Sequence, residues 1–281
     1  MNIDAHHHLW RYTPEEYGWI DDRLQALRRN FLPDDLRAEL QTANMAATIA
    51  VQARQSIEET RWLLDLATEN TFIQGVVGWA PIAAEDFSVT LDQLRQNSRL
   101  KGLRHVVQSE ADGFLDGPDF NRGIKALTEA GLVYDVLVFS RQLSEVIRFV
   151  DRHPNQSFVL DHIAKPEISD HRIEPWNQLI REVAHRENIV CKLSGMVTEA
   201  DWMNWSAAAL RPYFEAVLDA FGPERIMFGS DWPVLTTACS YQRWDQTVAE
   251  WIAPLSATEQ REIMGDVATR IYRLNVKPLQ Q

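Results

Sequence analysis

Cysteine is scarce in this sequence. Only Cys191 and Cys239 occur among 281 residues, which leaves neither a disulfide framework nor the paired spacing of a zinc finger. Long apolar runs are absent as well, so we expect no segment that spans a bilayer. The first residues also lack the basic and apolar regions of a signal peptide, and we therefore expect a cytoplasmic protein without membrane contact.

Positive charge is also in short supply. The 28 lysines and arginines are outnumbered by 40 aspartates and glutamates, and the formal net charge is −12. This balance argues against binding to a phosphate backbone, so we expect no nucleic-acid partner. Internal repeats, low-complexity stretches and linkers rich in proline or glycine are missing, while 45% of the residues are hydrophobic. We therefore expect one domain over residues 1–281.

Short apolar runs with β propensity recur along the chain, and a helical pattern follows them. A parallel sheet covered by helices explains such alternation, and eight units in 281 residues predict an α/β fold of the (β/α)8 TIM-barrel type. The main rival is a doubly wound open sheet, which the lack of a glycine-rich phosphate loop after the first run disfavours. Ser56 and Ser256, each three residues before a glutamate, predict two helix starts. The predicted strands cover residues 2–5, 47–53, 73–79, 101–107, 132–139, 157–162, 189–194 and 225–230.

Three consecutive histidines follow the first predicted strand. In an extended chain, alternation sends His6 and His8 to one face and His7 to the other. Two imidazoles on one face can hold a divalent metal or polarise a carbonyl group. Three histidines between Asp4 and an apolar aromatic stretch are a poor match for a purification tag. The His6 and His8 pair is a stronger indication of such a site because Asp231 follows another apolar run, where it could join them.

Other polar side chains gather at the expected carboxyl ends of the strands. Active sites of β/α barrels lie at that end, on the loops that follow the strands. His105 and Asp135 also fit ordinary buried hydrogen-bonding groups, and for Asp135, which falls inside its strand, we favour that role. The histidines on predicted helices or loops, His153, His171 and His185, are expected to be structural. The polar residues at strand ends are Arg54, Arg104, His105, His162, Lys165, Lys192 and Asp231.

Tryptophan is abundant, with ten residues. Two unusually long connections, over residues 9–31 and 195–209, carry several of them, and in a barrel these loops surround the mouth. Indole faces pack against the CH groups of a small ring, so we expect a small ring-shaped ligand there. For any single tryptophan, sealing a loop onto the barrel is the simpler role. The tryptophans of the two connections and of strand ends are Trp10, Trp19, Trp79, Trp202, Trp205 and Trp232.

The order of these motifs resembles the amidohydrolase superfamily, whose barrels carry His-x-His after strand one, a histidine after strand six and an aspartate after strand eight. His6 and His8, His162, and Asp231 stand at the matching places, and the resemblance covers essentially the whole chain. Three stretches look like the branch of pyrone-dicarboxylate and sugar lactonases, and two look closer still to L-fuconolactonase-like sugar lactonases. The first three are DHIAKP (161–166), CKLSG (191–195) and GSDWP (229–233), and the other two are YDVLVF (134–139) and VTEADW (197–202).

The resemblance implies hydrolysis of a lactone, with Asp231 as acid/base and with His6, His8 and His162 polarising the carbonyl. Metal-rich members complete their site with a carboxylated lysine or a histidine at the end of strand five, and residues 133–140 offer neither. We therefore expect no binuclear centre, and at most one divalent ion, such as zinc, on His6, His8 and Asp231. The resemblance to the lactonase branch implies that no metal is obligatory. The candidate substrate-binding residues are Trp10, Arg54, Arg104, His105, Lys165, Lys192, Trp202 and Trp232.

Other functions stay open on the same scaffold. One is a lactonase of 2-pyrone-4,6-dicarboxylate, another is a mononuclear zinc hydrolase or decarboxylase of an aromatic acid, and a third is a non-catalytic barrel that binds a sugar acid. Acidic Glu199 and Asp201 on the rim would accept hydrogen bonds from sugar hydroxyls and repel a carboxylate. We therefore expect a six-carbon sugar lactone, such as L-fucono- or L-galactonolactone. The sequence leaves the oligomeric state open, and a homo-oligomer is compatible with it.

Overall fold

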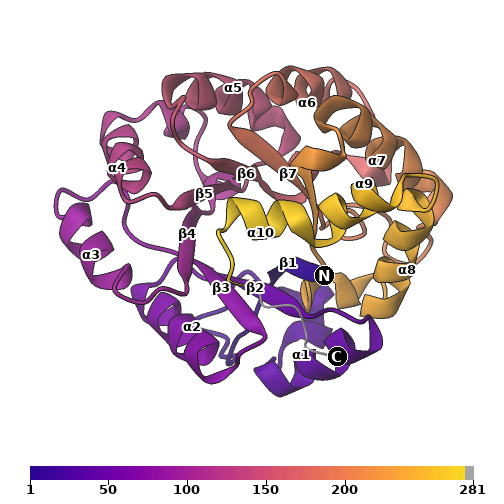
Figure 1. Cartoon of the computed structure of the whole chain (residues 1–281), viewed down its shortest axis with the longest axis horizontal. Helices are drawn as coiled ribbons and strands as arrows, with labels where there is room; N and C mark the ends of the chain where they lie inside the picture. The colour runs from indigo at the N-terminus through magenta and orange to yellow at the C-terminus, as the bar shows by residue number, and fades with distance from the viewer. Residues whose placement is uncertain (276–281) are drawn as a thin grey trace.

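Eight parallel strands form a barrel in the computed structural model, which describes residues 1–275. Each strand pairs with the next along the chain, and the helices lie outside them (Figure 1). Residues just beyond the last strand close the barrel, because Asp231 N donates to His6 O at 2.8 Å and His7 forms a parallel bridge with Trp232. The strands are β1 (Ile3–His7), β2 (Ala47–Val51), β3 (Ile73–Gly78), β4 (Leu100–His105), β5 (Val133–Val136), β6 (Phe158–Leu160), β7 (Ile189–Leu193) and β8 (Ile226–Phe228).

Helices alternate with the strands and form an outer ring (Figure 1). Beyond this ring, the chain continues through a short helix, a π-helical turn and a final helix that lies across the centre of the barrel in the figure. The ring helices are α1 (Pro33–Thr42), α2 (Ile57–Glu69), α3 (Phe87–Leu94), α4 (Pro118–Glu129), α5 (Leu143–Arg152), α6 (Trp176–Ala184), α7 (Ala207–Phe221) and α8 (Tyr241–Ile252). The closing segment consists of α9 (Ala257–Arg261), η9 (Glu262–Asp266) and α10 (Val267–Ile271).

The buried apolar side chains form two cores. The larger core lies between the strands and the ring of helices, and the smaller one fills the barrel. In the smaller core, small and branched side chains from alternate strand positions, such as Ile49 and Val133, pack with Val267 of α10 and with Tyr272, the residue that follows α10. The α10 segment therefore seals the end of the barrel at which the strands begin, and the opposite end is left for the site.

The structure confirms the barrel and excludes the open sheet. Both predicted helix starts are confirmed, since Ser56 Oγ accepts from Glu59 N at 3.2 Å and Ser256 Oγ accepts from Glu259 N at 3.3 Å. Several strands are shorter than expected; β6 ends at Leu160 because the backbone turns left-handed two residues later. Among the described residues, no helix has the length and apolar character required to cross a membrane.

Candidate active site

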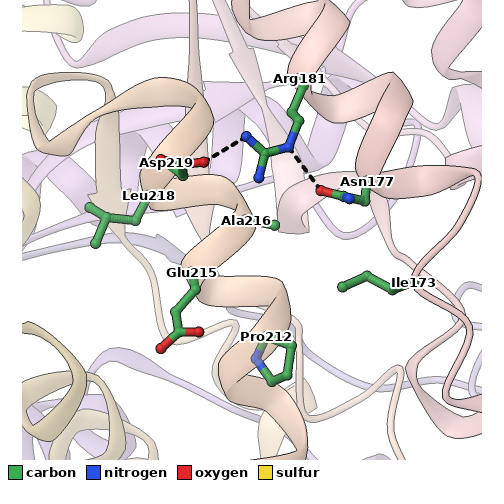
Figure 2. Close-up of a pocket in the computed structure, with 8 residues that line it drawn as sticks. All are labelled: Ile173, Asn177, Arg181, Pro212, Glu215, Ala216, Leu218 and Asp219. Atoms are coloured by element: carbon green, nitrogen blue, oxygen red, sulfur yellow. Dashed lines mark hydrogen bonds and ion pairs between the residues drawn. The ribbon is translucent and has the colours of Figure 1, made fainter.

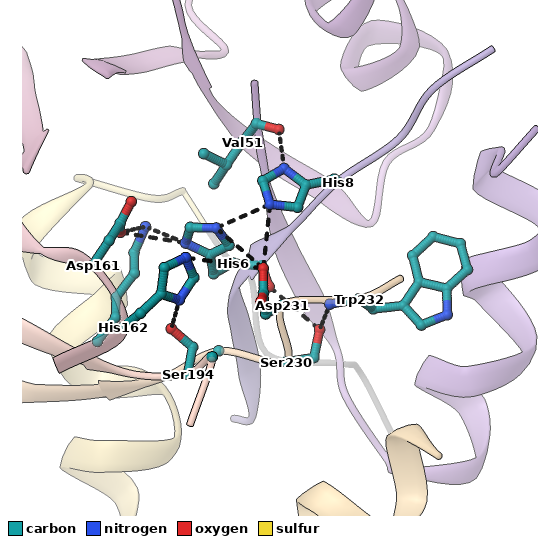
Figure 3. Close-up of polar contacts among 12 residues, drawn as sticks. His6, His8, Val51, Asp161, His162, Ser194, Ser230, Asp231 and Trp232 are labelled. Atoms are coloured by element: carbon teal, nitrogen blue, oxygen red, sulfur yellow. Dashed lines mark hydrogen bonds and ion pairs between the residues drawn. The ribbon is translucent and has the colours of Figure 1, made fainter. Parts of the chain in front are cut away.

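The two histidines of the His-x-His pair point into the mouth of the barrel, as expected. The pairing of β1 shifts register between Asp4 and His7, and this irregularity lets His6 face the barrel interior. His6 Nε2 and His8 Nε2 lie 3.3 Å apart, whereas His7 Nε2 contacts Thr48 Oγ1 at 3.0 Å on the other face. His8 Nδ1 is 2.9 Å from Val51 O and donates its proton to that carbonyl, which leaves Nε2 directed at the cluster (Figure 3).

Asp231 brings a buried carboxylate against these imidazoles. It follows β8 with a left-handed backbone (φ 60°). Its Oδ1 is 3.3 Å from His8 Nε2, 3.8 Å from His6 Nε2 and 3.9 Å from His162 Nε2 (Figure 3). Burial opposes ionisation, but His162 and His8 outweigh it and hold the pKa of Asp231 below its usual value. The carboxylate is therefore ionised at neutral pH.

His162 reaches the cluster from a left-handed turn after β6. His162, Ile163, Ala164 and Lys165 have φ values of 53°, 49°, 59° and 48°, an arrangement that costs roughly 1–2 kcal/mol per non-glycine residue. Trp176 Nε1 donates to Ile163 O at 2.7 Å and holds the turn in place. His162 Nδ1 contacts Ser194 Oγ at 2.9 Å, and burial lowers the pKa of His162 to about 4.

Beneath the imidazoles lies a layer of buried charges from β4 to β7. Lys192 Nζ is 2.5 Å from Asp135 Oδ2 and 3.1 Å from Asp161 Oδ1, and none of the three side chains is exposed. Arg104 Nη1 donates to Asp161 Oδ2 at 2.9 Å and lies 3.3 Å from His6 Nε2. Burial opposes ionisation of Asp161, but Lys192, His6 and Arg104 hold its pKa well below the usual value. Two anions and two cations thus form a neutral layer.

Asp4 ties β1 to the end of β8 and was missed as a functional candidate. Its Oδ1 accepts from His6 N at 3.1 Å and Ser230 N at 2.8 Å, and its Oδ2 accepts from Ser230 Oγ at 2.6 Å and Tyr241 OH at 3.0 Å. Asp4 therefore fixes the distance between the strand that carries the histidines and the loop that carries Asp231. Its only signal in the sequence is a carboxylate within the first apolar run.

Two of the expected substrate-binding residues, Trp10 and Trp232, have packing roles within the protein. Trp10 is fully buried, packs on Phe31 and donates to Arg29 O at 2.9 Å. Trp232 is 2% exposed, and Figure 3 shows its indole directed away from the imidazoles. Both side chains pack on Phe31 and thereby seal the connection over residues 9–31 onto the barrel. The Trp10 ring also lies 6.5 Å from the His8 ring, and substrate contact by either tryptophan stays a prediction.

His105 and Lys192 also differ from expectation. His105 leaves the barrel on the side opposite to Arg104, where it stacks on Phe114 at 4.8 Å and contacts Glu110 Oε1 at 2.8 Å. Alternation along β4 explains this, because neighbouring side chains point to opposite faces. Lys192 points inward but has no exposed surface, so it lies under His6 and does not reach the mouth.

The remaining cationic and aromatic candidates lie on the rim. Arg54 Nη1 pairs with Glu16 Oε1 at 2.7 Å, and its Nε is 3.6 Å from Glu59 Oε1. Lys165 Nζ pairs with Glu199 Oε1 at 3.4 Å. Trp202 is half-buried and donates to Thr198 O at 2.9 Å. Each rim cation is therefore matched with a carboxylate.

The spacing of His6, His8 and Asp231 fits a divalent ion. Their three facing atoms are separated by 3.3, 3.3 and 3.8 Å, and tetrahedral zinc with bonds of about 2.0–2.2 Å needs ligand atoms about 3.3–3.6 Å apart. A second group of metal-compatible atoms, on His6, Asp161 and His162, shares His6 with the first. In that group Asp161 is already engaged by Arg104 and Lys192, which disfavours a second cation.

A separate groove opens on the outer surface between α6 and α7. It has a volume of about 620 Å³ and is crossed by Arg181, which bonds to Asp219 Oδ2 at 2.7 Å and to Asn177 Oδ1 at 3.1 Å (Figure 2). The groove lacks the histidine cluster, which faces the barrel interior. We therefore assign the chemistry to the barrel mouth.

Comparison with known proteins agrees with this geometry. Residues 3–274 match the sequence model of a family described as amidohydrolase. The chain belongs to the amidohydrolase family. It is 42% identical to the L-fucono-1,5-lactonase of Burkholderia multivorans over 98% of this chain and 96% of that protein. It is 34% identical to the L-fucono-1,5-lactonase of Burkholderia ambifaria, with the same shares covered.

A solved structure of an amidohydrolase from Burkholderia multivorans with bound zinc is also similar. Its sequence is 42% identical, the match covers 98% of this chain and 99% of that one, and the TM-score is 0.95. The barrel architecture of this amidohydrolase is therefore shared over essentially its full length.

Proposed function

We propose that this amidohydrolase hydrolyses a six-carbon sugar lactone to the open-chain acid, with L-fucono-1,5-lactone as the first candidate. The observation that carries the proposal is the cluster itself, in which one carboxylate lies within 3.9 Å of three imidazoles at a barrel mouth. The full-length similarity to two L-fucono-1,5-lactonases supports the choice of substrate class.

Asp231 is the proposed general base and acid. It takes a proton from the water that attacks the carbonyl carbon and then gives that proton to the ring oxygen as the C–O bond breaks. The pKa of Asp231 is lowered, which makes it a weak base, and a strained or activated ester such as a lactone suits a weak base better than an amide does. Its backbone N–H is fixed on His6 O, so the carboxylate is held in place.

His6, His8 and His162 are the proposed partners of the carbonyl oxygen. Burial lowers the pKa of His6 and of His162, so both rings are neutral at pH 7 and can donate without adding charge. Donors that are already in place stabilise the oxygen as negative charge develops on it. Arg104, 3.3 Å from His6 Nε2, adds a positive charge at the edge of the same space.

The residues that would hold a zinc ion are His6, His8 and Asp231. When bound, such an ion supplies acidification of water and polarisation of a carbonyl. The zinc in the related Burkholderia multivorans structure supports binding of one ion here. Binding of zinc does not make zinc necessary for the reaction, and we propose that hydrolysis of the lactone does not depend on the metal.

The rim favours a neutral sugar ring over a dicarboxylate. A dianion needs cations that are free to pair with it, whereas Arg54 and Lys165 are already paired with Glu16 and Glu199. The same carboxylates can accept hydrogen bonds from sugar hydroxyls. The exposed acidic side chain of Asp201 on the adjoining loop adds to this preference.

A panel of lactones tests the proposal. Purified protein is mixed in weak buffer with a pH indicator and with L-fucono-1,5-lactone, L-galactonolactone, other aldonolactones or 2-pyrone-4,6-dicarboxylate. Acid release from a sugar lactone above the rate of an Asp231→Asn control supports the proposal. Turnover of the pyrone alone, or decarboxylation of an aromatic acid instead, would overturn it. A cytoplasmic location and a homo-oligomeric state stay predictions.

A further inference from the structure

Phe139 is an aromatic residue that the fold leaves open to solvent at the carboxyl end of the strands. It stands shortly after β5, which ends at Val136, and it is 36% exposed. Trp10, Trp205 and Trp232, on other connections at this end of the barrel, are each no more than 6% exposed. A lone exposed apolar side chain needs no explanation by itself, so the surroundings of Phe139 decide its role.

The backbone that carries Phe139 is held by buried hydrogen bonds. Phe139 N donates to Gln142 Oε1 at 3.0 Å, and Gln142 Nε2 donates to Val107 O at 3.0 Å, which ties the loop after β5 to the loop after β4. Gln108 N also donates to Leu137 O at 3.0 Å across the same two loops. The Phe139 ring is therefore presented from a fixed backbone, which reduces the entropy lost when a ligand packs on it.

Charged groups of the next two loops border the Phe139 ring. Lys165 Nζ lies over the ring, 5.7 Å from its centre, and pairs with Glu199 Oε1 at 3.4 Å. Lys165 belongs to the same left-handed turn as His162, and its positive charge helps to lower the pKa of His162 and of Asp231. A charge that acts on both groups lies near them, so Lys165 connects the Phe139 ring to the imidazole cluster.

An aromatic ring bordered by a carboxylate and an ammonium group suits the ring of a sugar. The CH groups of a sugar pack on the aromatic face, the carboxylate accepts from hydroxyl groups, and the ammonium donates to hydroxyl oxygens. In a six-membered ring of the galacto configuration, the axial hydroxyl at C4 leaves the hydrogens of C3, C4 and C5 on the opposite face. That face is a continuous apolar patch, which an aromatic ring can cover.

We propose that Phe139 is a specificity-determining residue that packs on the apolar face of a galacto-configured sugar lactone, while Glu199 and Lys165 bind hydroxyl groups at the edge of the same ring. This inference rests on the proposed function and adds to it the face of the substrate that the protein recognises. The packed CH groups lie away from the bond that breaks, so the contact is equally strong in the substrate and in the transition state. Phe139 therefore acts on KM and not on kcat.

Substitution of Phe139 tests the contact. In Phe139→Ala, the KM for L-fucono-1,5-lactone should rise about 2- to 12-fold, which corresponds to about 0.5–1.5 kcal/mol for one aromatic contact, and kcat should not change. Phe139→Tyr keeps the ring and should restore the native KM. L-rhamnono-1,5-lactone has its C4 hydrogen on the other face, so its KM should rise less in Phe139→Ala. Calorimetric binding of L-fucono-1,5-lactone to Asp231→Asn, with and without Phe139→Ala, should give the same ratio without turnover.

Met203→Ala is the matched control. Met203 lies on the loop after β7 that also carries Glu199, and it is 87% exposed, so this variant removes another exposed apolar side chain at the same end of the barrel. We expect its KM and kcat to equal those of the native protein. An unchanged KM in Phe139→Ala, an equal rise in Met203→Ala or in Phe139→Tyr, or an equal rise for both lactones would overturn this inference and leave the lactonase function standing. Failure of the native protein to hydrolyse any sugar lactone would instead overturn the proposed function, and this inference with it.

Discussion

At the scale of single residues, burial and charge act in opposite directions on the carboxylate and on the imidazoles of the site. Burial lowers the pKa of His162 to about 4, so this ring is a neutral donor at pH 7. Burial also opposes ionisation of Asp231, but the neighbouring histidines outweigh it and keep the pKa of this carboxyl low. The result is an ionised carboxylate beside a neutral imidazole, an arrangement that suits the general base and the hydrogen-bond donor of the proposed mechanism.

Asp231→Asn should keep the fold and lose the activity. The amide has the shape of the carboxylate but cannot take a proton from water, and a positioned general base contributes about 10²–10⁴ in kcat. The measurement is kcat on the best lactone of the panel, with circular dichroism and the melting temperature as controls. Near-normal turnover in a folded variant would remove Asp231 from the role of base.

Single residues also show what the sequence could predict about the site. His6, His8, His162 and Asp231 were identifiable because β/α barrels gather strand ends at one mouth. Asp4 was not, because its meaning depends on Ser230, which lies 226 positions away in the chain. The directions of the Trp10 and His105 side chains could not be predicted either, since an aromatic or polar residue at a strand end can point to either side of the barrel wall.

At the scale of elements, the left-handed turn after β6 is the feature that sequence patterns do not reveal. Ile163 and Ala164 have no preference for that conformation, and the turn survives because Trp176 and the surrounding core determine it. The regular strands and helices were predictable from periodicity. The strained turn was not, although it places His162 opposite Asp231.

Gly195→Ala should displace His162. Gly195 has φ +64°, and an added Cβ would lie 2.6 Å from His162 Nδ1. We expect a loss of stability of about 1–2 kcal/mol from the backbone alone, and a fall of about 10- to 100-fold in kcat from the shifted imidazole. Gly113→Ala is the matched control, because its φ is +88° with no atom within 4 Å of the added Cβ. It should lose similar stability and keep its kcat; equal kcat values for both variants would contradict the clash.

Glu59, in the first turn of α2, links three elements and should make stability depend on pH. Its carboxylate accepts from Ala53 N and Arg54 N, at 3.0 and 2.8 Å, and from Tyr17 OH at 3.2 Å. Burial raises the pKa of Glu59 from 4.5 to about 7, although Arg54 opposes the shift. A raised pKa means that the folded protein holds a proton that the unfolded chain has lost. The stabilising contribution is thus complete below pH 4.5 and disappears as the pH rises through 7.

Urea unfolding of native protein and Glu59→Gln at several pH values measures this effect. The free energy of unfolding of the native protein, relative to that of the variant, should fall by an amount on the order of 3 kcal/mol between pH 4.5 and 7.5. Other buried acids change with pH in both proteins, so only the difference between the two curves is informative. Parallel curves would show that Glu59 has the same pKa in the folded and unfolded chains.

At the scale of the whole molecule, the barrel holds its layer of two buried anions and two buried cations between two regions. The apolar core under the closing segment lies on one side of this layer, and the mouth lies on the other. Tyr272, which directly follows α10, donates to Asp135, so the end of the closing segment reaches the charged layer beneath His6. The barrel could be predicted from eight alternating units. The role of the closing segment in covering one end of the barrel could not, because the sequence of its short helices resembles that of any amphipathic C-terminal segment. The layer also limits the cations that the site can accept.

Removal of metal should leave the lactonase activity largely intact. One ion at most fits, because the second group of ligand atoms includes Asp161, which already faces Arg104 and Lys192. Protein dialysed against a chelator should therefore contain less than one zinc per chain and still open its lactone at a rate within a few-fold of the untreated sample. Added zinc should raise the melting temperature in proportion to the logarithm of its concentration above the dissociation constant, since it binds the folded state. If chelation abolishes turnover and zinc restores it, Asp231 acts first as a metal ligand, and the metal-independent mechanism is wrong.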